Sequence, residues 1–329
     1  MPKLKFKIPA PVFSLSLSLS NPSPMTLTVG FLGPEGTYSH QAARQQFESY
    51  KDKEQVIYKP LPTIASCFKS LETNDADYTV VPFENSTNGQ VVPTYDLFKN
   101  SNEKIDILAE QFVSIHHNFI TFGNDMSKIT KVYSHPQAWG QCTKFLAKYE
   151  LDNKIKVELI DTSSTAKAVE NLIALNSHEK LTTAAIASRT ASELFNVPIL
   201  FENIEEFSGN TTRFLVLGKD KNLKITPGLD EVSSVKMHLV TFVIKKNDNF
   251  GSLCDILALF KRYGLNLQTI TTRPSQDPWR YVFFVEVWHG DGFTNCLLEL
   301  QELVIKLRDL GGFYRSRKFL EMLGNPKEL

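Results

Sequence analysis

The sequence predicts an α/β fold with a larger part, built on a largely parallel sheet, and a smaller second module. Three observations predict it. From Thr26 to about residue 195, short apolar runs typical of strands alternate with helical patterns. A polar stretch at residues 219–235 then interrupts the alternation. The segments after it follow the order β-α-β-β-α, and 329 residues are enough for two hydrophobic cores.

The composition excludes several classes of function. Lys and Arg number 36, and Asp and Glu also number 36, so the chain has no net charge to attract nucleic acid or an anionic membrane. No apolar run approaches the roughly 18 residues that span a bilayer. The four cysteines are far apart, without a CxxC pair or matched histidines. The sequence therefore predicts reduced thiols and no metal site.

Residues 1–25 form an extension that differs in composition from the rest. Its first 24 residues hold three lysines, no acidic residue and an alternation of Ser and Leu. Two alternatives stay open. A disordered tail ahead of a second start at Met25 predicts a cytoplasmic protein. A transit peptide, which is basic, rich in Ser and poor in acids, predicts an organellar one.

The larger part, residues 26–218, contains four clear strand patterns. Each is an apolar run that leads into a polar turn and then a helical pattern. They lie at residues 26–33, 77–83, 131–134 and 183–188. Pro136 fits the first turn of the helix after the third strand, where its missing N–H has no partner to lose.

The second module, residues 236–329, predicts a ferredoxin-like β-α-β-β-α-β unit. Strands are expected at residues 236–245, 265–272, 280–288 and near 312–320. One helix is expected at residues 250–263. A second is expected from the helical spacing of Leu297, Leu300, Val304 and Leu307.

Polar residues gather just after the predicted strands of the larger part. Ligands of open α/β sheets bind beyond the carboxyl ends of the strands. Ser, Thr, Asn, Gln and one Arg suit a small, anionic, oxygen-rich molecule there. The candidate site residues are Thr37, Ser39, Glu84, Asn85, Ser134, Gln141, Thr211, Thr212, Arg213 and Phe214.

The glycines around the first strand exclude the common nucleotide loops. Gly30, Gly33 and Gly36 match neither GxGxxG nor GxxxxGK[ST]. The turn that they permit delivers Thr37 and Ser39 to a helix start, whose free N–H groups attract carboxylates.

Several candidates also have a simpler structural interpretation. Thr37, Ser39 and Ser134 fit helix N-caps, and Arg213 fits a surface ion pair. Glu84 fits a solvated loop carboxylate. Its place directly after a buried strand favours a functional role, because desolvation there would raise its pKa.

Taken together, five segments resemble the successive blocks of the prephenate dehydratase family. They are VGFLGPEGTYSHQAA, VVPFENSTNGQV, VYSHPQAWGQC, AAIAS and NTTRF, in the family's order. The Thr-Arg-Phe triplet at residues 212–214 is the most specific of them. The resemblance implies two α/β lobes with the substrate in the cleft between them, similar to periplasmic binding proteins.

The resemblance implies that prephenate is converted to phenylpyruvate, carbon dioxide and water without a cofactor. Hydroxide leaves poorly, so a donor must meet the departing oxygen while two carboxylates are held. Thr212 is expected to be that donor, with Glu84 as the alternative acid. Arg213 and the helix start at Ser39 are expected to hold carboxylates. The other substrate-binding residues implied are Thr37, Asn85, Ser134, Gln141, Thr211 and Phe214.

The second module resembles the ACT domain that binds phenylalanine in this family. The segment GSLCDILALF supplies Gly251, Ser252 and Leu253, and the family's Glu-Ser-Arg-Pro block corresponds to Thr271 followed by Thr272, Arg273 and Pro274. The resemblance implies L-phenylalanine as the effector, with a response altered by Thr271, and a homodimer or homotetramer. A chain ending near Gly218 is then expected to keep some activity without that response.

Two other functions stay open. Arogenate dehydratase performs the same elimination on the amino-acid analogue of prephenate, and the sequence does not separate the two substrates. A non-catalytic amino-acid-sensing binding protein would have the same cleft and second module. The retained Thr-Arg-Phe triplet argues against the binding protein.

Overall fold

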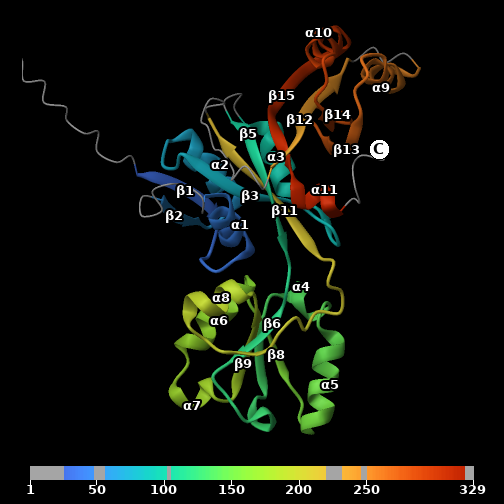
Figure 1. Cartoon of the computed structure of the whole chain (residues 1–329). Coiled ribbons are helices and arrows are strands. Elements are labelled where there is room, and N and C mark those ends of the chain that lie inside the picture. The colour runs from blue at the N-terminus through green and yellow to red at the C-terminus, as the bar shows by residue number, and fades with distance from the viewer. Residues whose placement is uncertain (1–25, 48–55, 102–104, 220–231, 246–249, 323–329) are drawn as a thin grey trace, which may run out of the picture.

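The computed structural model describes residues 26–47, 56–101, 105–219, 232–245 and 250–322. These residues form two lobes and a C-terminal unit, each built on a separate sheet (Figure 1). In this view the second lobe lies below the first lobe, and the C-terminal unit lies above the first lobe. The expected N-terminal extension and most of the expected linker fall outside the described residues.

The first lobe is a six-stranded mixed sheet. Its elements are β1 (Leu27–Leu32), α1 (Tyr38–Phe47), β2 (Val56–Leu61), α2 (Ile64–Glu72), β3 (Tyr78–Asn85), β4 (Gly89–Gln90), α3 (Val92–Asn100), β5 (Asp106–Ser114) and β11 (Thr211–Gly218). The strand order is β2-β1-β3-β11-β5, and β4 pairs with β3. The strands β1, β2 and β3 run parallel, whereas β11 is antiparallel to both of its neighbours.

The second lobe has a five-stranded sheet of the same mixed kind. Its strands are β6 (Asn118–Thr121), β7 (Lys131–Ser134), β8 (Glu158–Asp161), β9 (Thr183–Ala187) and β10 (Ile199–Phe201). Its helices are α4 (Pro136–Trp139), α5 (Thr143–Asn153), α6 (Thr165–Ala174), α7 (Ser177–Lys180) and α8 (Arg189–Phe195), with a 3₁₀ turn at Met126–Lys128. The order is β10-β6-β9-β7-β8, in which β7 is parallel to β8 and β9 while β6 is antiparallel to its neighbours.

The C-terminal unit is an antiparallel sheet with helices. It consists of β12 (Val232–Ile244), α9 (Ser252–Arg262), β13 (Leu267–Pro274), β14 (Tyr281–Trp288), α10 (Phe293–Leu303), β15 (Val304–Ser316) and α11 (Arg317–Met322). The strand order is β13-β14-β12-β15, and every pairing is antiparallel. This is the ferredoxin-like order that the sequence predicts.

Local sequence explains where the site-forming elements begin and end. The strand β9 is buried along its whole length, as its run TAAIA requires. The helices α6 and α8 begin at Ser164 and Ser188, whose side chains accept backbone N–H groups of the first turn. Pro136 occupies the first turn of α4, and the cap is His135 rather than Ser134.

The expected α/β class is confirmed, and some details are corrected. The sheets are not largely parallel, because β11 of the first lobe and β6 of the second lobe each run antiparallel to both of their neighbours. Val304 and Leu307 belong to β15 and not to the preceding helix. Their helical spacing is overridden by pairing with the long strand β12, which itself begins at Val232, inside the expected linker.

One hydrophobic core is shared by the first lobe and the C-terminal unit. Phe83, Leu215 and Leu217 of the first lobe pack in the same buried cluster as Phe284 and Phe313 of the C-terminal sheet. The second lobe has separate cores on the two sides of its sheet. The C-terminal unit is therefore built into the first lobe and not merely tethered to it. Among the described residues, no helix has the length and apolarity needed to cross a bilayer.

Candidate active site

A cleft of about 740 Å³ lies between the two lobes. The first lobe lines it with the loop after β1 and with the ends of β3 and β11, and the second lobe lines it with the starts of α4 and α6. The chain passes between the lobes from β5 to β6 and returns from β10 to β11. A space of this size suits a small-molecule ligand.

The strand β11 sends alternate side chains to opposite sides. Thr212 and Phe214 line the cleft, whereas their neighbours Thr211 and Arg213 do not. Thr212 lies opposite Asn85 in the ladder between β11 and β3. The expected donor is therefore carried by a strand that is paired on both sides, which fixes its backbone more firmly than a loop would.

A chain of hydrogen bonds crosses from the first lobe to the second. The Nδ2 group of Asn85 donates to Oγ1 of Thr212 at 2.9 Å and to Oδ1 of Asn210 at 2.7 Å. The Nδ2 group of Asn210 donates to Oε1 of Gln141 at 2.9 Å, which is also 3.0 Å from Nε2 of His117. Burial lowers the pKa of His117 and so keeps its ring neutral near pH 7.

The Thr212 hydroxyl has a hydrogen to donate. Oδ1 of Asn85 accepts the backbone N–H groups of Thr87 and Asn88 at 3.0 and 2.8 Å, and this fixes the amide with Nδ2 toward Thr212. In the described part of the chain, Asn85 is the sole hydrogen-bond partner of that hydroxyl. Because the hydroxyl accepts from Asn85, its own hydrogen is available to a ligand in the cleft.

Two helices present their first turns to the cleft from opposite lobes. Thr37 caps α1 and Ser164 caps α6, each by accepting an N–H of the first turn. Both caps line the cleft, as do Ser39 and Thr165 beside them. The remaining N–H groups and the helix dipole favour an anion at each end. The arrangement suits a ligand with two negative groups.

The loop before α1 contacts the second lobe directly. Gly36 has φ +79, and a Cβ there would lie 3.2 Å from Cα of Ala191, so the position requires glycine. Oγ of Ser188 donates to the Gly36 carbonyl at 3.0 Å. The Gly36 N–H donates to Nδ1 of His40 at 3.0 Å, and burial together with Arg44 lowers the pKa of His40 to about 4, which preserves this acceptor.

Histidines aside, two side chains that carry a charge at neutral pH line the described part of the cleft. They are Lys167 and Glu170. Nζ of Lys167 lies 2.7 Å from Oε2 of Glu170. Neither residue is among the candidates that the sequence suggests. The usable signal is that Lys167 stands in the first turn after the Ser164 cap, where a side chain can reach a ligand held by that turn.

Arg213 does not occupy the place expected of a carboxylate clamp. It is 4% exposed, and its guanidinium is paired with Glu110 at 2.9 Å and with Glu286 at 2.5 Å. Because side chains alternate along a strand, Arg213 faces away from the cleft that Thr212 and Phe214 line.

Three other expected site residues lie outside the cleft lining. Glu84 opposes Arg213 in the sheet, and its carboxylate is 3.8 Å from that guanidinium. Ser134 is fully buried and donates to the carbonyl of Ile186 at 2.8 Å, so it neither caps α4 nor meets a ligand. Thr211 is buried, with its backbone N–H bonded to Ser86. Of the expected set, the cleft gathers Thr37, Ser39, Asn85, Gln141, Thr212 and Phe214.

The expected effector residues lie on two elements of the C-terminal unit. Gly251 is the N-cap of α9 with φ +92, and Ser252 and Leu253 follow in its first turn. A Cβ at Gly251 would meet no atom within 4 Å, so the space around this turn is open.

The other effector segment, Thr272 to Pro274, ends β13 and contacts the first lobe. Arg273 forms a bidentate ion pair with Asp96 of α3. Its Nε and Nη2 groups donate to Oδ1 and Oδ2 of Asp96 at 3.0 and 2.9 Å. Nε2 of Gln90 donates to Oγ1 of Thr271 at 2.6 Å. Thr271, which stands where the family has Glu, is thus hydrogen-bonded to β4, and β4 follows Asn85 closely in the sequence.

The fold and the cleft define a two-lobed α/β protein with a cleft suited to a small anionic molecule and with a ferredoxin-like C-terminal unit. The prephenate dehydratase family model matches residues 29–222. A curated relative from Saccharomyces cerevisiae, named probable prephenate dehydratase, is 38% identical over 299 residues, covering 80% of this chain and 87% of the relative. The chain belongs to the prephenate dehydratase family.

Two solved structures share the fold. A prephenate dehydratase from Arthrobacter aurescens, in complex with L-Phe, has a TM-score of 0.74 and 24% identity, covering 89% of this chain and 91% of that one. GqqA, described as a novel type of quorum quenching acylase, has a TM-score of 0.70 and 21% identity, covering 88% and 98%. Proteins described as a prephenate dehydratase and as an acylase share this fold, so the family membership rests on the sequence matches.

Proposed function

We propose that the cleft converts prephenate to phenylpyruvate, carbon dioxide and water, with Thr212 donating a hydrogen bond to the departing hydroxyl. The single observation that carries this assignment is the Thr212 hydroxyl, which accepts from Asn85 and keeps its hydrogen for the ligand. A threonine hydroxyl is a weak acid. Its contribution is therefore a preorganised hydrogen bond to the charge that develops on the leaving oxygen, rather than complete proton transfer.

The remaining geometry supports a dicarboxylate substrate. Prephenate has two carboxylates, and the first turns of α1 and α6 offer an anion site in each lobe. Lys167 adds a positive charge on the α6 side. No cofactor is required, because formation of the aromatic ring drives the loss of carbon dioxide and water.

Glu84 is the weaker candidate for the acid. Burial raises the pKa of its carboxyl, which favours the protonated form that an acid needs. Its side chain, however, lies beside Arg213 and not in the cleft lining. Thr212 lines the cleft and Glu84 does not, so we assign the donor role to Thr212.

The proposal is tested by following phenylpyruvate absorbance when the purified full chain is given prephenate. Parallel reactions with arogenate decide between the two substrates, and the curated relative's name favours prephenate. Tight binding of prephenate without any product would identify a binding protein and refute the proposed reaction.

Lys167→Met is expected to raise the KM for prephenate about tenfold with a smaller change in kcat, because a charge contact held in both ground and transition state contributes to uniform binding. The variant also leaves the Glu170 carboxylate unpaired beside the substrate. Initial rates over a range of prephenate concentrations measure both constants. Lys128→Met, on an exposed turn away from the cleft, is the matched control. An unchanged KM in Lys167→Met would remove Lys167 from the site.

We also propose that L-phenylalanine regulates the enzyme through the turn at Gly251 and the end of β13. Support comes from the ferredoxin-like order of the C-terminal unit and from the L-Phe complex of the Arthrobacter aurescens structure. We further propose a homodimer or homotetramer and a cytoplasmic location. The four cysteines, none of them in a disulfide, agree with a reducing compartment.

Gly251→Ala is expected to raise the phenylalanine concentration needed for half-inhibition about tenfold and to leave the uninhibited rate unchanged. A Cβ at φ +92 strains the turn by about 1 kcal/mol and so disturbs the backbone that would hold the effector. Gly264→Ala is the control, because Gly264 has φ +67 with open space around it at the other end of α9. Equal responses of the two variants would argue against an effector site at Gly251.

A further inference from the structure

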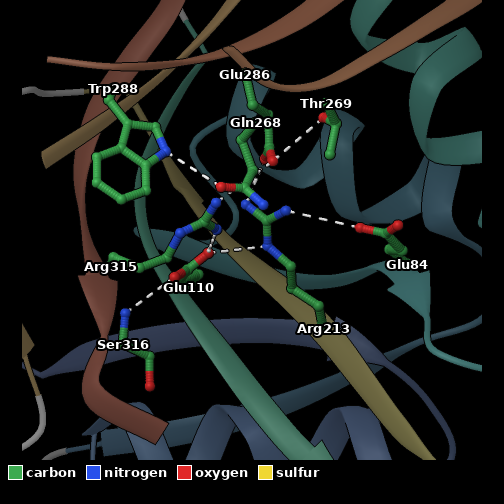
Figure 2. A network of polar contacts seen from close by, with 9 residues as sticks. All are labelled: Glu84, Glu110, Arg213, Gln268, Thr269, Glu286, Trp288, Arg315 and Ser316. Carbon is green, nitrogen blue, oxygen red and sulfur yellow. Dashed lines mark hydrogen bonds and ion pairs between the residues drawn. The ribbon is translucent and has the colours of Figure 1, made fainter. Parts of the chain in front are cut away.

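A closed ring of four buried charges joins the first lobe to the C-terminal unit (Figure 2). Arg213 and Glu110 come from the first lobe, and Arg315 and Glu286 come from the C-terminal sheet. Each is at most 4% exposed. Oε2 of Glu110 lies 2.9 Å from Arg213 and 2.8 Å from Arg315, and the carboxylate of Glu286 lies 2.5 Å from Arg213 and 3.5 Å from Arg315.

Every member of the ring depends on a charge from the other unit. Two positive and two negative charges balance within the ring, so loss of one leaves a buried charge without its partner. Burial raises the pKa of Glu286, yet the two arginines hold it below the usual range and keep the carboxylate ionised. Arg213 thus contacts one ring carboxylate from each unit, Glu110 of the first lobe and Glu286 of the C-terminal sheet.

Arg213 stands between the two cleft residues of β11. The register of β11 against β3 shifts between Arg213 and Phe214, where the ladder passes from Glu84 to Pro82 and skips Phe83. The guanidinium lies 5.2 Å from the ring of Phe83. The extra residue belongs to β3, and such an irregularity re-aims nearby side chains, so Arg213 stands where the pairing of β11 with β3 changes.

We propose that Glu286 is a positioning residue for the elimination, acting through Arg213 on the Thr212 hydroxyl. The inference rests on the proposed role of Thr212. The C-terminal sheet is then part of the catalytic apparatus and not only a sensor. Thr269 of β13 lies 3.3 Å from Glu286, so the strand with the expected effector segment contacts the same carboxylate.

The test begins with Glu286→Gln, which keeps the shape of the side chain and removes its charge. Displacing a reacting group by about 1 Å lowers the rate by up to about a hundredfold, so we expect kcat to fall by about tenfold or more while KM changes little. Asp96→Asn is the matched control: it also removes a charge pair between the units, the one with Arg273, away from β11. It should lower the melting temperature and leave kcat unchanged.

A second measurement separates positioning from general damage. In a Thr212→Ala background Glu286→Gln should cause no further loss of kcat, because its target is already absent. An equal loss in both backgrounds, or a folded Glu286→Gln enzyme with wild-type kcat, would overturn the inference. If Thr212→Ala itself kept full activity, the proposed function of Thr212 would fail instead.

A milder variant covers the case in which Glu286→Gln does not fold. Thr269→Val preserves the side-chain shape and removes only the hydrogen bond to Glu286. We expect a smaller loss of kcat that again disappears in the Thr212→Ala background. Wild-type kcat in Thr269→Val would then count against the inference.

Discussion

Replacement of Thr212 by alanine is expected to lower kcat for prephenate by about 10² to 10³, because one well-placed hydrogen-bond donor stabilises the transition state by about 3–4 kcal/mol. KM should change little, since the contact with the leaving oxygen strengthens only as charge develops there. Steady-state rates of phenylpyruvate formation measure both constants. The fold should be retained, because the hydroxyl has only Asn85 as its described partner.

The neighbouring threonine provides the control. Thr211→Ala removes a hydroxyl from the same strand, one residue away, on a side chain that does not line the cleft. It should keep kcat within about twofold of the original value, which corresponds to a free-energy change smaller than the contribution of one ordinary hydrogen bond. Similar losses in both variants would mean that the alternation along β11 does not decide which hydroxyl donates to the substrate, and the assignment of Thr212 would be wrong.

A chain that ends at Gly218 is expected to be unfolded and inactive. Removal of the C-terminal unit exposes the face of the first lobe that packs on Phe284 and Phe313. It also leaves Arg213 and Glu110 without their partners from β14 and β15. Breaking one buried ion pair costs about 3–5 kcal/mol, a large part of a typical total stability of about 5–15 kcal/mol.

This result would differ from the expectation that the sequence alone supports, in which such a chain keeps some activity. The measurement is thermal unfolding by circular dichroism, together with the prephenate assay. A chain ending at Met322, which keeps every described residue of the C-terminal unit, is the control. A cooperative melt and residual turnover from the chain ending at Gly218 would contradict the shared core as a requirement for folding.

The sequence located the cleft through the polar residues at the strand ends, and it placed Asn85, Gln141 and Thr212 among the candidates. It misplaced Arg213 for a physical reason. The apolar run that begins at Phe214 predicts a strand from that residue, which would leave Arg213 in a loop, free to turn toward a ligand. The strand in fact begins at Thr211, and strand geometry then sends residues 212 and 213 to opposite sides.

Other differences also come from long-range pairing, which a local pattern does not encode. The spacing of Leu300, Val304 and Leu307 fits a helix, and only the presence of β12 alongside converts the last two into strand. The partners of Arg213 are equally remote, at residues 84, 110 and 286 of the chain. The sequence near Arg213 therefore does not indicate these partners.

The position of β11 has a consequence for synthesis on the ribosome. The strands of the second lobe all lie between residues 118 and 201, so that lobe is complete as a continuous piece of chain. The first sheet needs β11 inserted between β3 and β5, although β11 is made after the whole second lobe. The N-terminal segment is therefore synthesised first but cannot complete its sheet until β11 follows. The middle of the polypeptide is the first part able to finish folding.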